Sequence, residues 1–235
     1  MPQQKINFEE RAVAFIDVLG FSALVNKAST QSSERIKLQT LVDSLESVIP
    51  LLNSTVDESI PNHLIPKHNY ISDCIILSAP LSDKDMESYC GLSVLVMRVI
   101  QITHRFLENG YLISGGISIG KVWHTESNII GPAYQDAFKI ESMNYLPCVL
   151  LSKKASKYWK TSSNFNSTMC FQHKGTFRVN GVHNYYIQNN TEHGVIEKTY
   201  EKYKNHAKEQ ISLKLPHRAK RKWQWFYAFL RKVSS

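Results

Sequence analysis

The chain has 235 residues, 43% of them apolar and 11% aromatic, and a formal net charge of +8. This length suits one large domain, with or without an appendage, and the apolar content excludes disorder as the main state. The sequence holds no run of 18 apolar residues, which argues against a membrane span, and its polar first eleven residues argue against a signal peptide.

The positive charge is concentrated near the C-terminus. Residues 198–235 carry 11 Lys or Arg against two Glu, whereas the rest of the chain is close to neutral. We therefore expect a main domain over residues 1–190 and a basic helical extension over residues 191–235. The four cysteines are scattered without zinc-ligand spacing and are expected to be free thiols, which favours the cytoplasm.

Hydrophobic periodicity predicts strands and helices in alternation. Strands are expected at residues 12–18, in two short pieces of 70–77, at 111–122, at 148–151, and near Met169, Phe177 and Tyr185. Helices are expected after Gly20 through about Lys27, over 33–48 with Pro50 closing it, over 92–106, and over about 131–143. This order predicts an α+β fold of the ferredoxin-like or palm type, with a mixed, mostly antiparallel sheet.

Two aspartates stand among apolar neighbours. Asp17 lies at the end of an apolar strand, and Asp73 lies at the tip of a tight hairpin. Removing a carboxylate from water costs on the order of several kcal/mol unless it is paired or bound to a metal. On neighbouring strands the two carboxylates could share magnesium-type ions, which prefer oxygen ligands and substrate phosphates. Asp17 could instead cap a nearby turn.

Four segments carry a resemblance to a known family. Residues 15–22 (FIDVLGFS) are similar to the first-strand signature of class III nucleotide cyclases, and Ser72-Asp73 resembles their Gly-Asp hairpin, with Ser in place of Gly. Residues 116–120 (GISIG) resemble a glycine-containing strand of the family, and residues 131–141 (GPAYQDAFKIE) resemble its closing helix. The segments follow the family order across about residues 12–150.

The resemblance implies a class III cyclase homology domain that acts on a nucleoside triphosphate. It implies two divalent cations, Mg²⁺ or Mn²⁺, held by Asp17, Asp73 and the backbone carbonyl of Val18. Substrate contacts are implied for the other residues of the first signature, namely Phe15, Leu19, Gly20 and Phe21. Because family sites form between two chains, a homodimer with composite active sites is implied as well.

The closing helix departs from the family pattern at two positions. The family has Asn and Arg where this chain has Gln135 and Lys139. The resemblance implies that Gln135 orients the ribose and that Lys139 binds the α-phosphate. Lys keeps the positive charge of Arg but loses its bidentate geometry. Ser114 stands where many members place a phosphate-binding Arg. Arg178 could supply that charge, or it could be an ordinary exposed strand residue.

Base recognition is the largest departure. Adenylate cyclases of the family carry Lys and Asp where this chain has Asn69 and Asn128. An amide donates and accepts hydrogen bonds and can pair with uracil or cytosine, although each Asn could also be a turn residue. The chain thereby resembles the pyrimidine cyclases of the Pycsar antiphage system. That resemblance implies UTP or CTP as substrate, and cyclic UMP or cyclic CMP as a messenger for a separate effector that does not contact the enzyme.

Other interpretations stay open. The domain could be an adenylate or guanylate cyclase, a non-catalytic nucleotide-binding module that dimerises, or a palm-type polymerase or other nucleic-acid binder. Residues 214–232 combine seven Lys or Arg with five aromatic residues. This tail could contact nucleic acid, which is the less favoured partner, or lie on an anionic membrane. It could also pack on the body near the triphosphate, or dock on the dimer with a solvated basic face.

Overall fold

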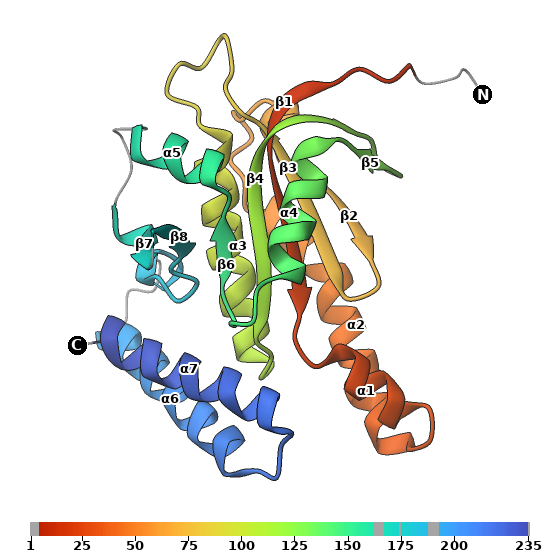
Figure 1. Ribbon diagram of the computed structural model, residues 1–235, viewed down its shortest axis with the longest axis vertical. Helices are drawn as coiled ribbons and strands as arrows, with labels where there is room; N and C mark the ends of the chain where they lie inside the picture. The colour runs from red at the N-terminus through yellow and green to blue at the C-terminus, as the bar shows by residue number, and fades with distance from the viewer. Residues whose placement is uncertain (1–4, 162–166, 174, 188–192, 235) are drawn as a thin grey trace.

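The computed structural model describes residues 5–161, 167–173, 175–187 and 193–234 (Figure 1). The strands are β1 (Glu9–Val18), β2 (Lys67–Ile71), β3 (Cys74–Pro80), β4 (Ile113–His124), β5 (Ile129–Ile130), β6 (Val149–Leu151), β7 (Cys170–His173) and β8 (Thr176–Val179). The helices are α1 (Phe21–Ala28), α2 (Ser32–Asn53), α3 (Gly91–Glu108), α4 (Pro132–Ser142), α5 (Lys153–Thr161), α6 (Val195–Ser212) and α7 (His217–Val233). Short 3₁₀ turns lie at Asn62–Leu64, Ser167–Met169 and Asn184–Tyr186.

The strands form one sheet in the order β2-β3-β1-β4-β6-β8-β7, and β5 pairs with β4 off this path. β1 lies between β3 and β4 and is antiparallel to both. Among the described strands only β4 and β6 pair in parallel, and the other pairs are antiparallel. The predicted α+β fold with a mixed, mostly antiparallel sheet is confirmed.

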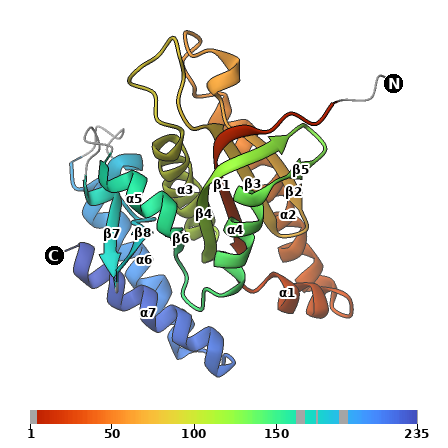
Figure 2. The same cartoon turned by 45° about the horizontal axis from the view of Figure 1, so that its top comes forward.

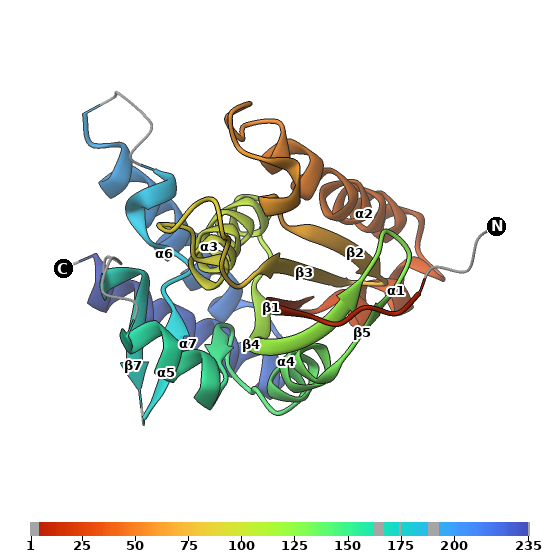
Figure 3. The same ribbon diagram turned by 90° about the horizontal axis from the view of Figure 1, so that it is seen from above.

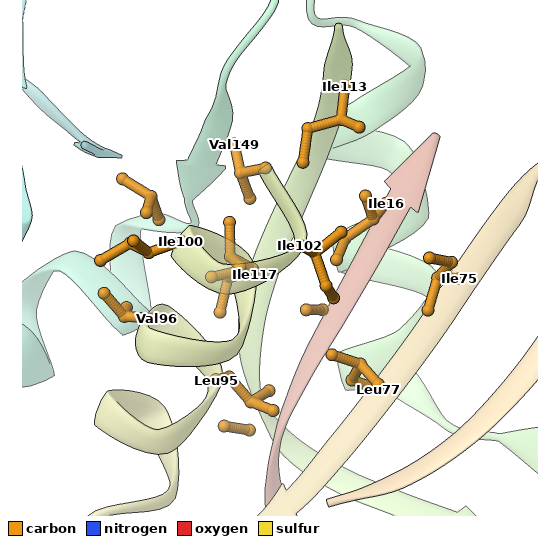
Figure 4. Close-up of a cluster of buried hydrophobic side chains, with 14 of the residues drawn as sticks. Ile16, Ile75, Leu77, Leu95, Val96, Ile100, Ile102, Ile113, Ile117 and Val149 are labelled. Atoms are coloured by element: carbon orange, nitrogen blue, oxygen red, sulfur yellow. The ribbon is translucent and has the colours of Figure 1, made fainter. Parts of the chain in front are cut away.

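The interior strand β1 is buried on both faces over residues 11–16 because helices cover both sides of the sheet (Figure 3). Its even-numbered residues from Ala12 to Val18 belong to the core shared with α2 and α3, part of which is drawn in Figure 4. Val13 and Phe15 point to the opposite face and pack under α4. Since side chains alternate along a strand, the side chain of Asp17 emerges on the α4 face.

Helix α4 lies directly on the sheet because glycines in β4 leave room for it. A Cβ atom at Gly116 would overlap the carbonyl oxygen of Ala137 in α4. From β1, the ring of Phe15 packs against the rings of Tyr134 and Phe138, with centroids 6.1 and 5.2 Å away. The predicted closing helix therefore exists, and its packing fixes its position over β1 and β4.

The basic tail folds as a helical hairpin, α6 and α7, that docks on the body of the same chain (Figure 2). An apolar cluster, here called the tail cluster, joins Tyr203, Trp223 and Phe226 of the hairpin to Leu107 and Leu112 of the body. The predicted domain boundary after residue 190 falls outside the described residues. No described helix has the length and apolar character that a membrane span requires.

A buried histidine also ties the hairpin to α3. Nε2 of His104 lies 3.1 Å from the carbonyl oxygen of His183 and must donate to it. Nδ1 therefore accepts from the hydroxyl of Tyr203, 2.9 Å away. This arrangement requires a neutral imidazole, and burial lowers the pKa of His104 to about 4.

Two element predictions are wrong. Pro50 does not end the second helix, because α2 continues to Asn53. Proline removes one backbone hydrogen bond, and the hydroxyl of Tyr70 donates to the carbonyl of Glu46 that this leaves free, at 3.4 Å. The strand expected near Tyr185 is a 3₁₀ turn instead. Helix α5 and strand β5 were not predicted.

His104 makes the stability of the fold depend on pH. Because its folded pKa lies below the ordinary value of 6.5, its contribution to stability is present above pH 6.5 and is lost as the pH falls toward 4. The unfolding free energy of the wild type should therefore fall by about 1 to 2 kcal/mol more between pH 7 and pH 5 than that of His104→Gln. Urea unfolding at the two pH values measures this. The exposed His173→Gln should retain the wild-type pH dependence, and equal dependence in His104→Gln would contradict the assignment.

Candidate active site

The fold brings Asp17 and Asp73 together. Asp17 pairs with Cys74 across β1 and β3, and Asp73 lies in the turn between β2 and β3. The carboxylate oxygens of both aspartates and Sγ of Cys74 lie within 4.8 Å of one another. The amide of Val18 donates to the carbonyl of Asp73 at 3.3 Å, which fixes the turn against the end of β1.

The electrostatics of this cluster are unfavourable without a cation. Burial, the charge of Asp73 and the charge of Glu141 together raise the pKa of Asp17 from 3.8 to about 7, with burial the largest cause. Burial also raises the pKa of the Cys74 thiol, and that thiol donates to Oδ1 of Asp17 at 3.7 Å. The donor set is thus two half-buried carboxylates, which suits a hard divalent cation such as Mg²⁺ or Mn²⁺.

The loop from β1 to α1 offers backbone groups beside the acid pair. Val18 is buried, and the amide of Leu19 donates to the carbonyl of Leu112 at 2.9 Å. Gly20 has a φ of 96°, which favours glycine, and the space where its Cβ would lie is open. Phe21 begins α1, whose N-terminus has no side-chain cap. The first amides of α1 are therefore free to bind an anion.

Phe15 of β1 lies beneath α4, whereas the two candidate residues of α4 lie on the opposite side of that helix. Phe15 is buried beneath α4, where it supports the helix. Gln135 and Lys139 are exposed on its outer face. Lys139 and Arg178 line one cavity of about 730 Å³ with Lys153, Lys154 and a single acid, Asp136, and neither Asp17 nor Asp73 lines it. The cavity that these residues line is called the basic cavity below.

Arg178 is a buried cation rather than an exposed strand residue. It lies on β8 opposite Leu150 of β6, and only 9% of its surface is exposed. One guanidinium nitrogen donates to Sγ of Cys148 at 3.3 Å, whereas Nε has no hydrogen-bond partner among the described residues. A buried guanidinium without a carboxylate is costly, so an anion from outside the chain is a natural partner.

The two base-reading candidates share a cavity of about 420 Å³, but their amides differ. The amide of Asn69 is used within the chain. Its Nδ2 donates to the carbonyl of Glu126 at 2.7 Å, and its Oδ1 accepts from Nε2 of His124. His124 is neutral, because burial lowers its pKa to about 3, and its Nδ1 accepts from Ser78 at 2.7 Å.

Asn128 uses its backbone for the structure and leaves its side chain exposed. Its backbone N–H donates to the hydroxyl of Thr125, and its backbone carbonyl accepts from the N–H of Thr125, which closes the turn before β5. Within the part of the chain that the structure describes, its side-chain amide makes no hydrogen bond. Of the two amides, that of Asn128 is the one free to recognise a ligand.

Sequence reasoning gave no role to three residues near the acid pair. Ser114 pairs with Asp17 across β1 and β4 and donates to Glu141 at 3.0 Å, so the position of the missing Arg is taken up by an internal hydrogen bond. Cys74 follows the hairpin aspartate directly. Burial and the charge of Arg218 lower the pKa of Lys222 in α7, whereas the charges of Asp17 and Glu141 act in the opposite direction. Only the order of residues in the hairpin could have indicated Cys74, because the roles of the other two residues depend on groups that are distant in the sequence.

Asp17 should destabilise the metal-free protein near neutral pH. Its folded pKa lies above the ordinary 3.8, so the stability linked to its proton is present below pH 3.8 and lost as the pH rises to about 7. At pH 8 without metal, Asp17→Asn should raise the unfolding free energy by roughly 1 kcal/mol, after discounting for partial exposure, and Tm by about 2 to 4 °C.

Thermal melts with EDTA or Mn²⁺ measure both effects. Mn²⁺ should raise the Tm of the wild type and of the exposed control Asp85→Asn, but not that of Asp17→Asn. A Tm for Asp17→Asn below that of the wild type in EDTA would contradict the electrostatic account.

No protein-family model matches the chain, and no curated protein matches it by sequence. Among solved structures it is similar to the guanylyl cyclase Cya2, with a TM-score of 0.50 and 12% identity over 78% of this chain and 98% of that one. The adenylyl cyclase CyaB from P. aeruginosa gives 0.48 and 14% over 75% and 95%. The dimeric guanylyl cyclase domain of RhoGC from Blastocladiella emersonii gives 0.49 and 15% over 73% and 95%. The similarity to Cya2 shows that the chain shares the fold of this guanylyl cyclase.

Proposed function

We propose that the chain is a metal-dependent nucleotide cyclase. The observation that carries the proposal is the meeting of the Asp17 and Asp73 carboxylates, in a fold shared with nucleotide cyclase domains. Two half-buried acids at one point destabilise the protein unless cations neutralise them. A site that is unstable when empty but suited to hard cations is best explained by a reaction that uses those cations.

The reaction would close the ribose onto its own phosphate. The 3′ oxygen bonds to the α-phosphorus and loses its proton, the bond from that phosphorus to the bridging oxygen breaks, and diphosphate leaves. Two divalent ions held by Asp17, Asp73 and the Val18 carbonyl would supply acidity at the 3′-hydroxyl and neutralise phosphate charge. Gly20 and the free amides of α1 would hold phosphate oxygens beside them.

The cationic half of the site would come from a second copy of the chain. Lys139 and Arg178 line the basic cavity, which does not include the acid pair. The outer face of α4 and its following loop also expose apolar side chains, with Phe138 50%, Met143 64% and Tyr145 71% exposed. A two-fold dimer through this face would cover them and bring the basic cavity of one protomer to the acid pair of the other. Gln135, on the same exposed face, would orient the ribose.

We further propose that the substrate is a pyrimidine nucleotide, UTP or CTP. Asn69 and Asn128 carry neutral amides where purine-reading charges would be expected, and the free amide of Asn128 would read the base while Asn69 holds the loop. The product, cyclic UMP or cyclic CMP, would act as a messenger in antiphage defence. The four cysteines are free thiols, which supports a role in the cytoplasm.

Product analysis tests the reaction and the base together. The purified protein is incubated with each of the four nucleoside triphosphates and Mn²⁺, and products are resolved by mass spectrometry. We expect cyclic UMP or cyclic CMP with diphosphate, a decrease of roughly 100-fold or more in Asp17→Ala and in Asp73→Ala, and no change in Asp85→Asn. Cyclic AMP or cyclic GMP as the main product would contradict the pyrimidine assignment.

Triphosphate binding without any product would favour a non-catalytic module. The hydrogen bond from Ser114 to Glu141, at a position where a cation was expected, also supports this alternative.

Complementation tests the composite site. Asp17→Ala lacks the acidic half and Lys139→Ala weakens the cationic half, so each homodimer should have little activity. After the two proteins exchange subunits, half of the dimers are mixed and each has one intact site, so about a quarter of wild-type activity should return. Two variants that both lack the acidic half, Asp17→Ala and Asp73→Ala, serve as the control and should not complement. Failure of the first pair, with subunit exchange verified, would contradict a shared site.

A further inference from the structure

A second basic cavity lies between α7 and the loop that follows α4. Its volume is about 670 Å³, and Arg218, Arg221 and Lys222 of α7 line it together with Tyr145 and Leu146 of the loop. The guanidinium of Arg218 lies 5.7 Å from the centre of the Tyr145 ring. No carboxylate is among the residues that line the cavity. It is called the α7 cavity below.

The three cations of the α7 cavity are not balanced by acids. Among the described residues, none of them forms an ion pair, whereas Lys204 of the neighbouring helix pairs with Glu201 at 2.8 Å. Neighbouring positive charges repel one another and attract an anion. A ligand with several negative charges would relieve this repulsion better than a single carboxylate.

The α7 cavity is connected to the end of β1 through the tail cluster. Leu19, two residues after Asp17, packs against the tail cluster that contains Trp223, the residue next to Lys222. Burial lowers the pKa of Lys222 and Arg218 lowers it further, whereas Asp17 and Glu141 act in the opposite direction. The charge of Asp17, one member of the acid pair, therefore acts on Lys222. Figures 1 and 2 both show α7 near the loop between α4 and β6.

Across both strands that pair with β1, the residue opposite Asp17 is uncharged, Cys74 on β3 and Ser114 on β4. Ser114 lies opposite Asp17, and its hydroxyl donates to Glu141. We propose that α7 forms a polyphosphate subsite of the same protomer, in which Lys222, Arg221 and Arg218 bind the β- and γ-phosphates of the triphosphate and then the departing diphosphate. This inference rests on the proposed function, because it assumes a nucleoside triphosphate at the acid pair.

The burial of apolar side chains of α7 argues against the alternative that this helix anchors the protein to a membrane. Trp223, Phe226 and Leu230 are 8%, 3% and 0% exposed and pack inside the protein. The apolar face of α7 is thus already used, and its charged face is what remains available. An amphipathic helix that binds a bilayer needs its apolar face free.

Binding measurements test the subsite without requiring catalysis. Isothermal titration of the full chain with Mn²⁺ uses inorganic diphosphate, UTP and UMP as probes. We expect Lys222→Ala and the exposed Arg221→Gln each to weaken diphosphate and UTP binding about tenfold and to leave UMP binding unchanged. Lys222→Arg should restore binding. Arg231→Ala, an exposed cation in the last turn of α7, is the matched control and should behave as the wild type.

The outcomes separate this inference from the cyclase assignment. Selective loss of diphosphate binding in the Lys222 and Arg221 variants supports the subsite even if the wild type makes no cyclic product, in which case only the cyclase proposal fails. The inference is overturned if those variants bind diphosphate like Arg231→Ala, or if the wild type does not bind diphosphate. Higher cyclase activity in Lys222→Ala would also overturn it, because α7 would then obstruct the site. Arg221 is exposed, so its variant remains informative if Lys222→Ala unfolds.

Discussion

The desolvation of Asp17 is the constraint on which the candidate site depends. β1 lies inside the sheet between β3 and β4, and helices cover both of its faces, so a carboxylate at its end loses much of its water. The turn after β2 then adds a second acid within 4.8 Å. The cations that we propose for this site, two metal ions, Lys222 of the tail and the basic cavity of a second protomer, would all neutralise this concentration of negative charge.

The elements that bear the acid pair could be predicted because their signals are local. The apolar run of β1, the tight hairpin around Asp73 and the glycine that precedes α4 each lie within about a dozen residues. Predictions failed where packing overrode a local signal. Pro50 is held inside α2 by the core on which that helix lies, and the segment around Tyr185 is short and bonds locally as a 3₁₀ turn.

Roles that depend on distant partners could not be predicted in the same way. From sequence, Asn69 and Asn128 are equivalent amides, yet the chain of donors from Arg11 through Ser78 and His124 engages Asn69 alone. From sequence, Arg178 could be a phosphate-binding cation or an ordinary exposed strand residue, and only the pairing of β8 with β6 shows that its side chain is buried. Side chains that are joined across 30 to 67 positions acquire these roles only when the sheet is assembled.

The tail cluster has a consequence for how this protein could be dissected. Leu107, Leu112 and Val182 belong to the body, but their apolar surfaces are covered by side chains of α6 and α7. Cutting the chain before the hairpin would leave those surfaces in water and would withdraw the support under Leu19, the residue that follows the end of β1. The match to Cya2 covers 98% of that domain and only 78% of this chain, which could suggest that the rest can be removed. We expect instead that a chain without the hairpin would aggregate, because its exposed apolar surfaces would associate. The hairpin is part of the folding unit rather than an accessory to it.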